Sequence, residues 1–141
     1  ISNFCLPDQR SRHNLHYWHN LPFIALGSGA TGYINNLRYT NVPDLKGYMQ
    51  GWEQGTPHYE SEELTSIDQE MDETMMLGMR LLQGVSAEAF RRRYKVSYFV
   101  VYEQVIADLL EKNLVEYVGG YLRVTKAGLL FENLVSGAFL R

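Results

Sequence analysis

Cysteine is nearly absent from this sequence, which contains only Cys5. A single thiol excludes an internal disulfide and any metal or cluster site built from several thiolates. It favours a reducing, cytoplasmic setting. The apolar neighbours Phe4 and Leu6 predict that Cys5 is a small buried residue rather than a nucleophile.

Long apolar runs and an excess of basic charge are missing as well. No apolar run approaches the ~18 residues of a membrane span, and the first residues lack the basic-then-apolar order of a signal peptide. The net charge of −3 gives no general attraction to nucleic acid or to an anionic membrane. Because the chain starts at Ile1 with a short β-prone run, we expect a piece of a longer protein.

The first part of the chain consists of short, glycine-punctuated segments. A strand-like run opens at Phe23, and Asn35-Asn36 between two β-prone runs predicts a hairpin. Pro43 is typical of the first turn of a helix, which we expect to run to about Trp52. The next block, residues 60–73, holds seven acids and no Lys or Arg.

The second half is more regular and predicts a helix-rich module. Ser86 is placed to cap a short helix, a further helix is expected over about 97–112, Gly119-Gly120 predicts a hairpin, and Thr125 opens a last helix. The first helix of this half carries an apolar stripe at helical spacing, formed by Ile67, Met71, Met75, Met79 and Leu82. Three helices, a two-stranded wing and a final helix are the order of a winged-helix module.

A winged helix first suggests a DNA-binding regulator, but the charges oppose this interpretation. The helix in the recognition position carries Glu103, Asp108 and Glu111 against a single Lys112. Phosphate contacts dominate DNA affinity, so an acidic recognition helix is repelled. The arginines at 91–93 are consecutive and point in different directions on a helix. A packing or docking module is favoured over a nucleic-acid partner.

The segment RHNLHYWHN, residues 12–20, concentrates histidine and aromatic residues. On a helix, His13 and His16 share a face, whereas His19 lies further round. A zinc site needs at least three protein ligands, and Asp8 is the only nearby carboxylate. The pattern therefore predicts no dedicated metal site. The alternative is a short helix that Tyr17 and Trp18 anchor to a core.

The glycines at 27, 29 and 32 have the spacing of a dinucleotide fingerprint. A hairpin follows them in place of the required helix, so a nucleotide-phosphate site is not predicted. Close approach of the backbone to a ligand and a simple tight turn both stay open. No Ser–His–Asp order, paired carboxylates or activated cysteine stands out, and we assign no catalytic residue to this chain.

Several stretches resemble the radical-SAM proteins known as oxygen-independent coproporphyrinogen III oxidase-like, and within them the HemW-like haem-chaperone branch. The resemblance covers essentially the whole chain. It rests on ISNFCLPDQRSRHNLHYW with its H-N-x-x-Y-W pattern, FIALGSGATGY, DQEMDETMMLGMRLLQGVS, LLEKNLVE and LRVTKAGLLFENLV. The family commonly has histidine where this chain has Thr31, so no role of that histidine is carried over.

The resemblance implies an α+β, mainly helical fold. Residues 1–55 would form the end of a partial radical-SAM (β/α) barrel, and residues 56–141 a HemN-type, winged-helix-like C-terminal domain. The cysteine motif that holds the [4Fe–4S] cluster of the family is absent, and such a cluster needs thiolate ligands. The cluster and S-adenosylmethionine are thus expected only in a full-length parent. This chain alone should be inactive and would pack against its own missing N-terminal barrel.

The resemblance also implies a function and two groups of binding residues. The parent would bind haem and pass it to haem-recipient proteins; an oxygen-independent coproporphyrinogen III oxidase of porphyrin biosynthesis and a DNA-binding regulator are the alternatives. The implied haem contacts are His13, Asn14, Tyr17 and Trp18, and the implied S-adenosylmethionine contacts are Leu26, Gly27, Gly29 and Ala30.

Overall fold

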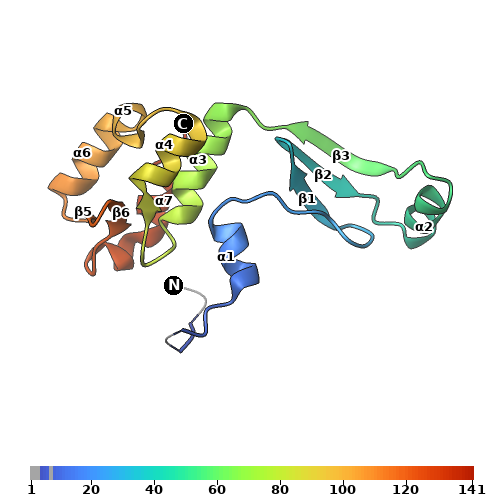
Figure 1. Ribbon diagram of the computed structural model, residues 1–141, viewed down its shortest axis with the longest axis horizontal. Helices are drawn as coiled ribbons and strands as arrows, with labels where there is room; N and C mark the ends of the chain where they lie inside the picture. The colour runs from blue at the N-terminus through green and yellow to red at the C-terminus, as the bar shows by residue number, and fades with distance from the viewer. Residues whose placement is uncertain (1–3, 7) are drawn as a thin grey trace. The chain divides into compact units, whose positions relative to one another are not determined.

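The computed structural model describes residues 4–6 and 8–141 and shows an α+β chain, as predicted. Its described part contains short helices and two three-stranded antiparallel sheets. The chain forms two compact units (Figure 1). Residues 22–66 make up the smaller unit, and the larger unit combines the residues up to Leu21 with Ile67–Arg141. No helix in the described ranges has the length and hydropathy that crossing a membrane requires.

The smaller unit is a meander of three strands in the order β1-β2-β3. The strands are β1 (Thr31–Ile34), β2 (Leu37–Asn41) and β3 (Tyr59–Leu64). Asn35 and Asn36 connect β1 to β2 with φ of 50° and 62°, which confirms the predicted hairpin. β3 is exposed along its whole length and carries three glutamates of the acidic block.

Helix α2 (Leu45–Glu53) lies between β2 and β3 in the chain. It starts two residues after Pro43 because Asp44 is the N-cap, its carboxylate accepting a hydrogen bond of 2.7 Å from the Gly47 amide. It ends before Gly55, whose φ of 69° leaves the helical region. The predicted helix is therefore present, with its start set by the acidic cap.

The larger unit contains seven helical segments in its described part and a second sheet of order β4-β6-β5 (Figure 1). In chain order its elements are α1 (Arg12–Trp18), α3 (Ile67–Gly78), β4 (Val85–Ser86), α4 (Ala87–Tyr94), α5 (Tyr98–Val101), α6 (Glu103–Glu111), β5 (Val115–Val118), β6 (Tyr121–Val124), η1 (Gly128–Phe131) and α7 (Glu132–Gly137). The hairpin β5–β6 turns at Gly119 and Gly120, with φ of 60° and 85°, as predicted.

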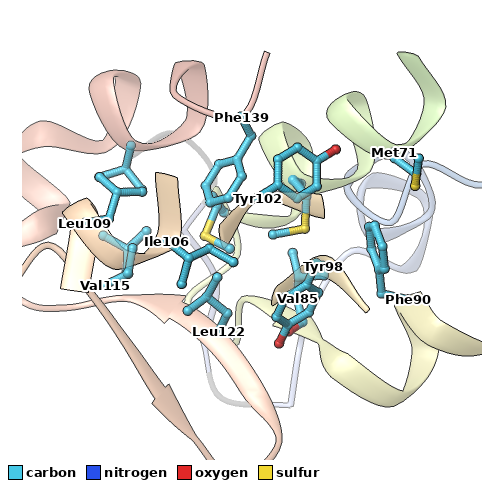
Figure 2. Close-up of a cluster of buried hydrophobic side chains, with 14 residues drawn as sticks. Met71, Val85, Phe90, Tyr98, Tyr102, Ile106, Leu109, Val115, Leu122 and Phe139 are labelled. Carbon is cyan, nitrogen blue, oxygen red and sulfur yellow. The ribbon is translucent and has the colours of Figure 1, made fainter. Parts of the chain in front are cut away.

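A cluster of buried apolar side chains fills the described part of the larger unit. Figure 2 shows the cluster with ten of its members labelled; they come from the helices and from the sheet. Met71, Met75 and Met79 belong to it, which confirms the central part of the methionine stripe. Its two ends are wrong: Ile67 is 61% exposed and Leu82 is 68% exposed. Ile67 is the first residue of α3 and Leu82 lies beyond its last, so helical spacing no longer directs Leu82 inward.

Two predicted helices are each divided into two segments. The helix expected over 97–112 breaks at Tyr102, whose φ of −118° and ψ of 30° are not helical. The Tyr102 hydroxyl donates a 2.6 Å hydrogen bond to the buried Asp72 carboxylate on α3. The last helix begins as η1 and breaks at Phe131 (φ −116°, ψ 23°). Both breaks are single-residue departures that periodicity does not reveal.

Candidate functional site

The histidine-rich segment forms the seven-residue helix α1. Ser11 is its N-cap, and the serine Oγ accepts a hydrogen bond of 3.3 Å from the Asn14 amide. Asn20 follows the C-cap His19 and adopts a φ of 50°, the left-handed conformation that ends many helices. The predicted short helix is therefore present.

The four candidate haem contacts lie on one face of α1. At about 100° per residue, positions 13, 14, 17 and 18 cover a continuous arc of about 140°. The His13 and Tyr17 rings are in edge contact at 4.9 Å, and both residues are exposed. This half of the arc presents an imidazole and a phenol to the solvent.

The other half of the arc contacts the larger unit. Trp18 is half-buried, and its ring centroid is 6.0 Å from the guanidinium of Arg80, just beyond the end of α3. The Arg80 Nε lies 3.7 Å from a carboxylate oxygen of Glu132, the first residue of α7. Trp18 provides this aromatic contact, whereas Tyr17 is 37% exposed.

A buried asparagine provides the main attachment of this segment. Asn20 is only 6% exposed, and its side-chain amide donates to the Thr74 hydroxyl at 3.1 Å and to the Glu70 carbonyl at 3.4 Å. Both acceptors are on α3. Because a buried amide must find partners, these bonds fix where the chain leaves α1.

Arg93 on α4 completes this polar cluster. Its guanidinium donates to the Asn20 carbonyl at 2.8 Å and to the His19 carbonyl at 3.4 Å, and it forms an ion pair with the buried Glu70 carboxylate. The hydroxyls of Tyr94 and Thr74 share a hydrogen bond of 2.7 Å beside it. Burial raises the pKa of Tyr94, so the phenol stays protonated.

Sequence reasoning did not assign Asn20, Glu70 or Arg93 to the site. A usable signal is the run of three arginines, whose side chains point in different directions on a helix. Arg93 points to Glu70, whereas Arg92 lies 3.6 Å from the exposed Glu88 on its own helix. One turn of α4 therefore contributes one arginine to the attachment of α1 and another to the surface.

The remaining histidines and the cysteine occupy different surroundings. Burial and the neighbouring His16 lower the pKa of His19, which favours the neutral imidazole. Within residues 4–6 and 8–141, no three His, Cys, Asp or Glu side chains are grouped to hold a metal ion. Cys5 is exposed, so the prediction that it is buried is wrong. Its neighbours Phe4 and Leu6 are also exposed, at 85% and 67%, and do not cover it.

Backbone groups of the glycine loop, residues 26–30, form hydrogen bonds within the smaller unit. The Gly27 amide donates to the Tyr48 hydroxyl at 3.1 Å, and the Gly29 amide donates to the Val42 carbonyl at 3.1 Å. The Asn41 side chain donates to the Gly27 carbonyl at 2.8 Å, and the Ala30 carbonyl accepts from the Asn41 amide at 2.9 Å. Leu26 is 79% exposed. Two amides and two carbonyls of this loop are therefore engaged within the smaller unit.

Comparison with known proteins gives both a family and relatives of known name. Residues 66–131 match the family model of the HemN C-terminal domain. The chain is 38% identical over 141 residues to the heme chaperone HemW of Bacillus subtilis, covering 99% of this chain and 37% of that protein. It is 32% identical over 140 residues to HemW of Lactococcus lactis, covering 99% and 36%.

A solved structure shares the fold. The coproporphyrinogen III oxidase HemN of Escherichia coli, a radical SAM enzyme, aligns with a TM-score of 0.63 and 15% identity, covering 84% of this chain and 28% of that one. The chain thus spans about a third of the length of the relatives that it matches. From these matches, the chain is a HemW-like sequence whose residues 66–131 match the HemN C-terminal domain.

Proposed function

We propose that this chain is part of a haem chaperone that binds haem and passes it to recipient proteins in the cytoplasm. Similarity to HemW over 99% of the chain supports this function. The observation that carries it is the face of α1, where an exposed imidazole stands beside an exposed phenol. An imidazole is a common ligand of haem iron, and aromatic rings suit the flat porphyrin.

The four residues of this face have distinct proposed roles. His13 is the candidate iron contact, since its ring is exposed. Tyr17 and Trp18 supply ring surface on either side of Asn14 on the helix, and the Asn14 amide is a polar contact. Haem is the cargo in this proposal.

The residues present do not fit the radical-SAM cofactors. A [4Fe–4S] cluster is held by several cysteine thiolates, and this chain has only the exposed Cys5. We therefore assign no radical step to it and expect the chain alone to be inactive as a radical-SAM enzyme. Contact of Leu26, Gly27, Gly29 and Ala30 with S-adenosylmethionine remains a prediction for the full-length protein.

The architecture of the full-length protein is part of the same proposal. The order α3, α4, α6, hairpin β5–β6 supports a winged-helix-like C-terminal domain. The meander of the smaller unit would end a partial barrel, and the other strands of that barrel would belong to the rest of the full-length protein. The division of the chain at residues 55 and 56 remains a prediction.

Haem titration of the 141-residue chain tests the role of His13. We expect His13→Ala to shift the Soret band and to weaken binding by about tenfold, equivalent to about 1.4 kcal/mol. His16→Ala, on the same helix, is the matched control and should bind haem like the unmodified chain. Identical spectra and affinities for all three proteins would remove His13 from the site.

Two other functions are less well supported. The solved structure that shares the fold is a coproporphyrinogen III oxidase, but the relatives found by sequence similarity are named haem chaperones. Oxidative decarboxylation of coproporphyrinogen by the reconstituted full-length protein would favour the oxidase. For a DNA-binding regulator, α6 exposes Glu103, Asp108 and Glu111, which phosphates repel. A salt-dependent shift of random duplex DNA would favour the regulator.

A further inference from the structure

Arg80 stands at the edge of the candidate haem face. It lies two residues after the last residue of α3, and its guanidinium faces the Trp18 ring at 6.0 Å from the centroid. Its side chain is 36% exposed. A cation at this distance from an indole is within the range of a cation–π contact, so the ring and the charge form one surface.

The guanidinium of Arg80 is weakly engaged by the protein. Its charged neighbour Glu132 lies 3.7 Å from Nε, which is longer than a hydrogen bond. The Glu132 Oε1 is buried and has no hydrogen-bond partner in the described part of the chain. The Arg93 guanidinium, in contrast, donates to two backbone carbonyls and to Glu70.

The terminal nitrogens of Arg80 accordingly remain available for an acceptor from outside the chain. Within residues 4–6 and 8–141, no protein oxygen accepts a hydrogen bond from its side chain. A guanidinium presents its donors as a planar fork that matches a carboxylate in two parallel hydrogen bonds. The matching ligand has a flat apolar body for Trp18 and a carboxylate at its rim.

We propose that Arg80 binds a carboxylate of the tetrapyrrole that lies along the α1 face, with Trp18 in contact with the macrocycle. This inference rests on the proposed function and adds a specificity residue to it. His13 contacts the iron, whereas Arg80 recognises the acidic rim of the ligand. A carboxylate-free tetrapyrrole loses the second contact and keeps the first.

A purely structural role for Arg80 makes a different prediction. If Arg80 only held Trp18 and α7 together, its removal would weaken the binding of every tetrapyrrole by the same factor. If it binds a carboxylate, its removal weakens only ligands that carry one. Haem and haem dimethyl ester separate the two roles because they differ only in whether the carboxylates are blocked.

The test titrates both ligands into the full chain and its variants. We expect the unmodified chain to prefer haem to the dimethyl ester by about tenfold, as one charge-assisted pair of about 1.4 kcal/mol provides. Arg80→Gln should abolish the preference and leave the affinity for the ester unchanged. Arg80→Lys, which keeps the charge but loses the fork, should retain part of it. Arg92→Gln, a change at an exposed arginine, is the control and should keep the full preference.

The outcomes separate this inference from the proposed function. An Arg80→Gln variant that still prefers haem tenfold, or that loses affinity for both ligands equally, would overturn the role of Arg80 and leave that of His13 intact. Metal-free protoporphyrin adds a further comparison: Arg80→Gln should weaken its binding, and His13→Ala should not. Absence of haem binding by the unmodified chain would overturn both proposals.

Discussion

Asn20 serves the candidate site at the scale of a single residue. Its backbone turns the chain out of α1 at a φ of 50°, its amide donates to α3, and its carbonyl accepts from Arg93. All of these groups are satisfied although the residue is 6% exposed. The position of α1 therefore depends on a polar cluster, with a smaller contribution from the half-buried Trp18.

Arg93→Gln should destabilise the larger unit by about 2–3 kcal/mol, because it leaves the Glu70 carboxylate buried without its cation. The His19 and Asn20 carbonyls also lose a donor. Urea unfolding of this variant and of Arg92→Gln provides the measurement. Arg92 is 73% exposed and its loss should cost less than about 0.5 kcal/mol. Equal stabilities for the two variants would contradict the cluster as described.

The lowered pKa of His19 predicts a specific pH dependence of stability. The unfolded chain protonates His19 near its ordinary pKa of 6.5, whereas the folded chain does so only at lower pH. The contribution is therefore present above pH 6.5 and is lost as the pH falls toward the lowered pKa. Melting of His19→Gln at about pH 7.5 and pH 5.5 should show a smaller difference than the unmodified chain. Identical differences would show that His19 does not contribute.

At the scale of elements, α3 organises the larger unit. Its methionines enter the core, and its two buried acids bind distant parts of the chain: Glu70 pairs with Arg93, and Asp72 with Arg141. Periodicity was sufficient to predict the methionines. The acids were interpreted only as a charge block, since their partners lie far along the chain and local patterns carry no information on such pairs. The two hairpins were predictable because their turn residues determine them locally.

Two helical glycines provide an element-scale prediction. A methyl group on Gly128 would overlap the Leu114 carbonyl oxygen, where η1 passes against the end of α6 and the start of β5. Gly128→Ala should therefore cost about 2–3 kcal/mol through overpacking. Gly137 at the end of α7 meets nothing within 4 Å, and Gly137→Ala should stabilise by about 0.5 kcal/mol. Thermal unfolding measures both, and a neutral Gly128→Ala would refute the close approach.

At the scale of the whole molecule, the two units have very different cores. The apolar cluster of fourteen buried residues lies in the larger unit, whereas the smaller unit buries Ala25 and Tyr33 among its described apolar residues. The larger unit is also discontinuous, because residues up to 21 join residues 67–141. A reading of composition along the chain could not predict this, since the linking residues are Asn20, Glu70 and Arg93. The assignment of haem contacts to the face of α1 rests on the resemblance to a family and stays a prediction.

Separate cores predict separate unfolding, which amide hydrogen exchange can resolve. Met75 is fully buried in the cluster, so Met75→Ala should cost roughly 2–5 kcal/mol and accelerate exchange in α6. The amides of β2 should exchange at their original rates, because the cluster has no member in the smaller unit. Ile67→Ala, at a 61% exposed position of the same helix, is the matched control and should change neither.

The converse variant completes this prediction. Asn41 is 1% exposed and holds the Gly27 carbonyl, so Asn41→Ala should accelerate exchange in β1 and β2 while α6 stays protected. Its loss leaves the part-buried Gly27 carbonyl without this donor in a unit that buries few apolar side chains. Acceleration of both units by either Met75→Ala or Asn41→Ala would show one cooperative structure, and the helical unit could then not support α1 independently of the meander.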